Sequence, residues 1–142
     1  MFKIFKKNEM KSDDEEIILS KIGSLLIHVA RVDEQYTNDE KNIIKKTLTE
    51  LGANKKKIEE IITIAEQNEE NSNQILDFTK EIKNLSEEKK EIIIECLWTI
   101  IYSDTKSDMY ESSLMRKLSG LIYFDNKKFG DIKEKVKNKI KK

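Results

Sequence analysis

The sequence of 142 residues contains no proline, only four glycines, one histidine and a single cysteine, Cys96. The shortage of proline and glycine removes most of the turn signals that separate short strands, and apolar residues recur at three- and four-residue spacings almost throughout. One cysteine excludes an internal disulfide, and no Cys/His cluster has the spacing of a zinc site. These absences predict an all-α domain, large enough to fold without a disulfide or a structural metal.

Membrane-spanning and secretory signals are also lacking. The longest apolar run, residues 92–102, is interrupted by Glu95 and Thr99 and is shorter than the roughly 20 residues that a membrane span needs. The basic N-terminus lacks the apolar core and cleavage site of a signal peptide. Positive and negative side chains balance at 27 each, so the global charge indicates no partner. We expect a cytoplasmic protein with a short basic segment, residues 1–12, before a single domain, residues 13–142.

An internal repeat with an offset of 71 positions divides this domain into halves, at about residues 13–70 and 86–140. Each half has a long apolar segment that ends at an aspartate, followed seven residues later by a glutamate. The polar residues along the two apolar segments coincide as well: they are Ser20, Ser24 and His28 in the first half and Glu91, Glu95 and Thr99 in the second. A period near 70 residues indicates a duplicated half-domain rather than a solenoid.

Local signals mark where helices begin and end. Capping boxes at residues 12–15 and 37–40 predict two helix starts, because the first side chain and the glutamate three residues later satisfy free amide groups. Gly52 predicts the end of the second helix, since glycine tolerates the left-handed conformation of a C-terminal cap. A short helix at residues 73–85 would join the halves.

Two predicted helices, at residues 13–31 and 87–103, are apolar on most sides and should pack side by side at the centre. The shorter amphipathic helices would surround them, giving a single compact bundle of about seven helices built from two repeated halves. We expect Cys96, Trp98 and Phe129 to be core residues, with Cys96 an unreactive thiol. His28 is expected to be a hydrogen-bonded packing residue rather than a ligand.

The turns that follow the two apolar helices are the candidate site, because each brings several carboxylates into one loop. The acids are Asp33, Glu34, Asp39 and Glu40 in the first turn and Asp104, Asp108 and Glu111 in the second. Calcium and magnesium select hard oxygen ligands of this kind, although the spacing is not that of an EF-hand. The alternative is that these acids only cap helices, since Glu40 and Glu111 stand where capping-box glutamates belong.

The pattern resembles the TerB-like family of tellurite-resistance proteins. The residues that carry the resemblance are an apolar helix that ends in Ala30-Arg31-Val32-Asp33, a polar turn and then Glu40, with Asp104 and Glu111 repeating the arrangement. The resemblance covers about residues 17–136. It implies a compact fold of about seven helices with acidic turns at equivalent places in two halves.

The resemblance also implies a function. In that family the turn acids, here Asp33, Glu40, Asp104 and Glu111, are proposed to bind divalent cations. Related modules occur in tellurite-resistance and stress-response systems and in the N-terminal part of a membrane-tethered J-domain co-chaperone. This chain has Glu34 and Thr105 where members of the family commonly have glycine.

A second candidate surface is the C-terminal stretch, residues 127–142, with eight lysines and apolar residues that share one helical face. It suggests weak contact with an anionic membrane surface or with a protein partner. No nucleic-acid motif is present, and we expect no nucleic-acid partner.

These observations favour a non-enzymatic binding or sensing module. No nucleophile–base pair, phosphate loop or liganding histidine set is visible in the sequence. The favoured mechanism has the acidic turns binding a divalent cation, calcium or magnesium first. The alternative is a protein–protein or membrane-peripheral adaptor that uses the basic C-terminal helix.

Overall fold

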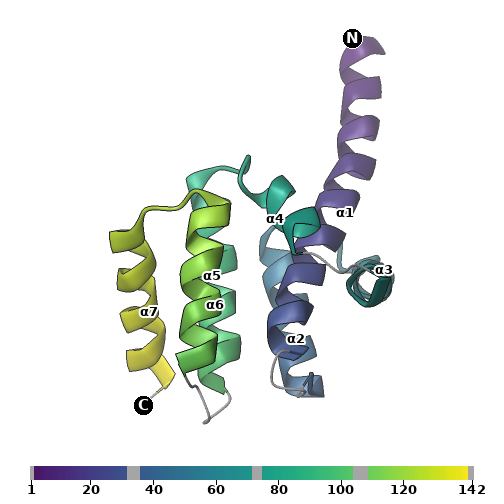
Figure 1. The fold of residues 1–142 in the computed structure, drawn as a ribbon. Coiled ribbons are helices and arrows are strands. Elements are labelled where there is room, and N and C mark those ends of the chain that lie inside the picture. The colour runs from purple at the N-terminus through teal and green to yellow at the C-terminus, as the bar shows by residue number, and fades with distance from the viewer. Residues whose placement is uncertain (1, 32–35, 72–74, 104–108, 141–142) are drawn as a thin grey trace.

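The computed structural model describes residues 2–31, 36–71, 75–103 and 109–140, with the side chains of residues 2–13, 103, 109–112 and 140 left aside. All its regular elements within these ranges are helices (Figure 1). They are α1 (Phe2–Arg31), α2 (Asn38–Glu50), α3 (Ile58–Asn71), α4 (Leu76–Ile82), α5 (Glu87–Ser103), α6 (Met109–Ile122) and α7 (Asn126–Ile140). The predicted all-α fold is therefore confirmed.

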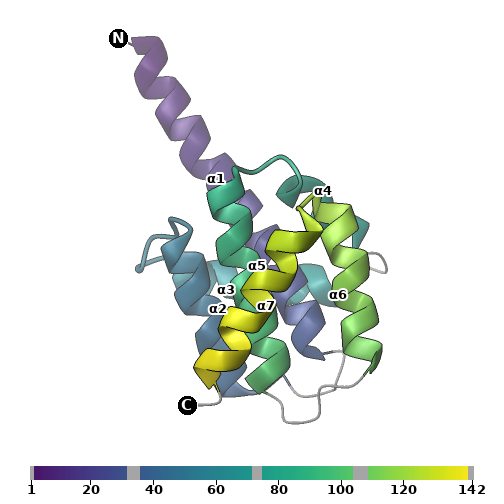
Figure 2. The ribbon, with the colours of Figure 1, turned by 90° about the vertical axis from the view of Figure 1, so that its left-hand side faces the viewer.

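The two apolar helices, α1 and α5, pack against each other in the centre of the bundle, as expected. α3 packs across α1, α7 packs against α5, α2 contacts both central helices, and α4 contacts α1 and α6 (Figures 1 and 2). Leu25 and Leu26 of α1 and Ile93 and Leu97 of α5 are completely buried. Burial of both apolar faces in one core stabilises this arrangement.

The helix ends show the internal repeat in three dimensions. Gly52 (φ 116°) follows the C-terminal end of α2, as predicted, and its counterpart 71 positions later, Tyr123 (φ 60°), follows the end of α6. In each half the next amide donates to a carbonyl five residues back, at 2.9 Å in the first half and 3.2 Å in the second. This is the Schellman form of a helix C-terminus. The two halves therefore share a turn geometry but not the residue that occupies it.

The prediction that the first helix begins at the capping box of residues 12–15 is wrong, because α1 begins at Phe2. Residues 2–12 contain neither glycine nor proline and include several lysines, which favour helix, so nothing interrupts the helix before Ser12. The first turns of α1 project beyond the other helices (Figures 1 and 2). The joining helix, α4, is also shorter than expected and ends at Ile82.

The aromatic core between α5 and α7 matches the prediction. Trp98 and Phe129 are buried, with ring centroids 5.3 Å apart in an edge-to-face arrangement. Cys96 of α5 is also buried, and burial raises the pKa of its thiol to about 12. Within the part of the chain described above, none of the helices has both the length and the apolar character needed to cross a membrane.

Candidate functional site

The acidic turns are anchored at one end of the bundle. α1 and α5 run in the same direction, so Arg31 and Ser103, their last residues, lie at the same end, where α2 and α6 begin (Figures 1 and 2). Of the predicted ligands, Asp33, Glu34, Asp104 and Asp108 lie outside the described residues. Glu111 lies in the first turn of α6, and its side chain is also outside what is described.

Glu40 forms the predicted capping box at the start of α2. The Thr37 amide donates to Glu40 Oε1 at 3.0 Å, and the Glu40 amide donates to Thr37 Oγ1 at 3.2 Å. Glu40 is buried, whereas its neighbour Asp39 is exposed. One oxygen of Glu40 is therefore engaged in fixing the helix start, and Asp39 is the more accessible carboxylate of this turn.

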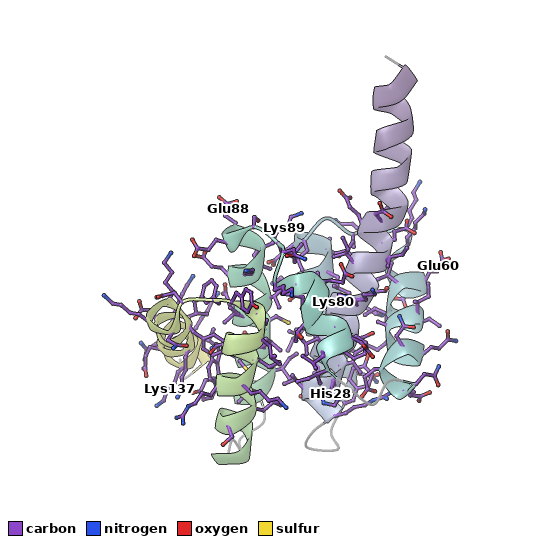
Figure 3. All side chains as sticks on the ribbon, turned by 45° about the horizontal axis from the view of Figure 1, so that its top comes forward. His28, Glu60, Lys80, Glu88, Lys89 and Lys137 are labelled. Atoms are coloured by element: carbon purple, nitrogen blue, oxygen red, sulfur yellow. The ribbon has the colours of Figure 1, made fainter. Side chains whose placement is uncertain are left out.

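A polar cluster ties the end of α1 to α3. Glu69 of α3 contacts His28 through Oε2, 3.2 Å from Nδ1, and accepts a hydrogen bond from Arg31 Nη1 through Oε1. The Glu69 side chain is only 11% exposed, so the two contacts are partly shielded from solvent. His28 is hydrogen-bonded, as predicted, and Figure 3 shows it at the end of the bundle where the first acidic turn begins.

Tyr36, just before α2, extends this cluster. The Arg31 guanidinium lies 5.3 Å from the centroid of its ring, within the range of a cation–π contact. Burial raises the pKa of the Tyr36 phenol above its ordinary value, and the nearby Glu66 carboxylate adds to the shift. The hydroxyl is nevertheless without a hydrogen bond of good geometry within the described residues. Glu66 also forms an ion pair with Lys41, at 3.4 Å.

The role of Glu69 was not predicted, because the polar run at residues 67–71 hides the helical pattern around it. A usable signal was present: Ile62, Ala65 and Glu69 continue one helical stripe at three- and four-residue spacing. This stripe faces the polar positions of α1, since Ser24 Oγ donates to the Ala65 carbonyl at 2.8 Å. The polar stripe on α1 is therefore its line of contact with α3.

The described residues do not form a complete metal site by themselves. Among them, no group of three or more His, Cys, Asp or Glu side chains is arranged to hold a metal ion. Asp39 and Glu40 supply oxygen donors of the type that calcium and magnesium use, but Glu40 is partly engaged as a cap. A cation site at this end would depend on the acids of the two turns, and it stays a prediction.

The fold and the candidate site define an all-helical bundle of two similar halves, each with an acidic turn after its central helix. Residues 20–134 match the family model described as Tellurite resistance protein TerB, and the chain belongs to this family. The comparisons with curated proteins and with solved structures gave no match. Family membership confirms the resemblance drawn from the repeated Asp-to-Glu spacing.

Proposed function

We propose that the protein is a non-enzymatic binding module that takes a divalent cation, calcium or magnesium, at its two acidic turns. The observation that carries this proposal is the parallel packing of α1 and α5, whose C-terminal ends lie at one end of the bundle. The C-terminal end of a helix carries partial negative charge and favours a cation. Asp33 and Asp104 follow these ends at equivalent places in the repeat.

Asp33 and Asp104 would be the principal ligands in this proposal, with Asp39 and Glu111 supporting them and Glu40 remaining the cap of α2. A bound cation supplies positive charge that relieves repulsion between the turn carboxylates. It would order the connections that lead from the central helices into α2 and α6. The orientation of those helices would then depend on the cation, and with it the surface offered to a protein partner.

Membership in the family supports placing this module in the response of the cytoplasm to tellurite and related stress. That role depends on the partner, because a fold does not by itself define an activity.

The proposal is tested by calorimetry and thermal melting with calcium, magnesium, manganese and zinc. The native protein is compared with an Asp33→Ala/Asp104→Ala variant and with Asp131→Ala, which removes an exposed aspartate from α7. A cation at about 100 times its Kd should stabilise the native protein by about 2.7 kcal/mol, or several degrees in Tm. The double variant should lose this effect and the control should keep it. Equal binding by all three proteins would refute the proposal.

The second candidate is an adaptor that uses α7. This helix buries Phe129 and Val136 in the core, while Lys127, Lys135 and Lys139 remain exposed. Figure 3 shows another of its lysines, Lys137, on the side of the bundle formed by α7. Basic groups near an anionic membrane contribute about 1 kcal/mol each.

This adaptor function predicts salt-sensitive binding to vesicles that contain phosphatidylserine, and none to phosphatidylcholine alone. A Lys127→Glu/Lys135→Glu/Lys139→Glu variant should lose the binding. Vesicle binding that persists in this variant would exclude α7 as the contact surface, whatever the result of the cation titration.

A further inference from the structure

A groove of about 310 Å³ lies between α4 and the end of α6. Leu76 and Tyr123, on its two sides, are 52% and 72% exposed, and they are two of the four large apolar or aromatic residues exposed within the described chain. Leu121 adds a further apolar side chain to the lining. The groove is thus an accessible surface on which apolar side chains predominate at the edges.

At two positions of this groove, the residue present is not the type that the local backbone conformation favours. Tyr123 adopts φ 60°, where its counterpart in the first half is Gly52. Gly120, by contrast, is a glycine inside a helix, and a Cβ atom built on it meets nothing within 4 Å. Glycine would relieve the backbone at position 123, and alanine would favour the helix at position 120. Residues that break local rules in this way are expected at functional sites.

The position of Tyr123 is fixed from two sides. Lys90 of α5 is buried and donates from Nζ to the Tyr123 carbonyl, at 3.4 Å. Lys83 Nζ lies 5.6 Å from the centroid of the Tyr123 ring. The Tyr123 ring is therefore held at the edge of the groove by the backbone conformation of Tyr123, by Lys90 of α5 and by Lys83 after α4.

The charge of the groove is positive. Lys80 and Lys83 line it together with no carboxylate, and within the described residues neither lysine forms an ion pair. Arg116 and Lys117, both exposed, lie one helical turn before Gly120 and Leu121 on α6. Figure 3 shows Lys80 on α4, on the face turned toward the viewer.

We propose that the groove between α4 and α6 binds an acidic amphipathic segment of a partner protein. The apolar side chains of that segment would pack on Leu76, Leu121 and Tyr123, while its carboxylates would pair with Lys80 and Lys83. Because Gly120 has no side chain and no atom lies near the place of a Cβ, the segment could approach the α6 backbone closely. The groove lies at the opposite end of α6 from the second acidic turn, about 20 Å along a helix of 14 residues, so it is separate from the proposed cation site.

The test is selection from a display library of short helical peptides, followed by fluorescence anisotropy with the enriched peptides. We expect them to carry Asp or Glu beside Leu, Phe or Trp at three- and four-residue spacing. Tyr123→Gly and Lys80→Glu/Lys83→Glu should each weaken their Kd by about tenfold or more, whereas Lys135→Glu on α7 should leave it unchanged. The Tm of Tyr123→Gly should not fall below that of the native protein. Weaker peptide binding can then be assigned to the missing Tyr123 side chain and not to unfolding.

Three outcomes would overturn the proposal. The first is that no peptide is enriched, or that the enriched peptides are basic. The second is that they bind both groove variants as tightly as the native protein. The third is found by sedimentation velocity: a native dimer that becomes a monomer in Tyr123→Gly would assign the groove to a second copy of this chain. None of these results depends on whether the acidic turns bind a cation.

Discussion

The same substitution, glycine to alanine, should have opposite effects at Gly52 and Gly120. A new Cβ meets no atom within 4 Å at either position, so neighbouring side chains contribute little to the difference. Gly120 lies within α6, where alanine favours the helix by about 1 kcal/mol. Gly52 has φ 116°, and a side chain in that region costs about 1–3 kcal/mol. Part of this cost is offset because alanine also restricts the unfolded chain.

We therefore expect Gly120→Ala to stabilise the protein by about 1 kcal/mol and Gly52→Ala to destabilise it by a similar amount. Urea unfolding followed by far-ultraviolet circular dichroism measures both free energies. With a slope of about 1–3 kcal/mol per M, the two midpoints should move in opposite directions by roughly 0.3–1 M. Gly130→Ala, in α7 and equally open, is a second helical control and should behave like Gly120→Ala. Shifts of the same sign at Gly52 and Gly120 would refute the reasoning.

Other predictions follow from packing, burial and capping. Gly23→Ala should destabilise by about 1–3 kcal/mol in the same unfolding assay, because its Cβ would lie 3.1 Å from that of Ala65; an unchanged midpoint would contradict this. Thr37→Ala should cost about 1 kcal/mol by removing the cap, and Thr37→Ser should restore most of it. Cys96 should not react with Ellman's reagent at pH 8 until urea unfolds the protein. Since burial raises its pKa to about 12, its contribution to stability is complete below about pH 8.5 and is lost as the pH rises toward 12.

The sequence predicted the fold well because the main signals are local and repeated. Helical periodicity, the capping box at Thr37 and the glycine at Gly52 act within a few residues, and each appears in the structure where expected. The start of α1 was predicted wrongly for a related reason. Ser12 has the composition of a cap, but a cap forms only where the preceding backbone leaves the helix, and residues 2–11 favour helix.

The candidate site was less predictable, because it depends on which elements meet. The repeat indicated that Asp33 and Asp104 are equivalent, but only the parallel packing of α1 and α5 brings the ends of their helices to one side. The pairing of Glu69 with His28 and Arg31 joins residues about 40 positions apart, and it required the orientation of α3 against α1. The groove beside Tyr123 likewise needs α4, which has no counterpart in the repeat.

The duplicated halves hold the ends of their central helices by different means. Arg31, at the end of α1, is fixed by the Glu69 carboxylate of α3. Its counterpart at the end of α5 is Tyr102, which stacks on Trp98 with ring centroids 5.9 Å apart.

This difference affects how the two turns would respond to their surroundings. Salt screens the ionic contacts of the first half but hardly affects the aromatic stack of the second. The two halves share the backbone geometry at Gly52 and Tyr123 but differ in the side chains that hold the ends of α1 and α5. A cation bound at the proposed site would therefore connect a half whose contacts are sensitive to ionic strength with one whose contacts are not, and this difference offers a physical basis for the proposed sensing function.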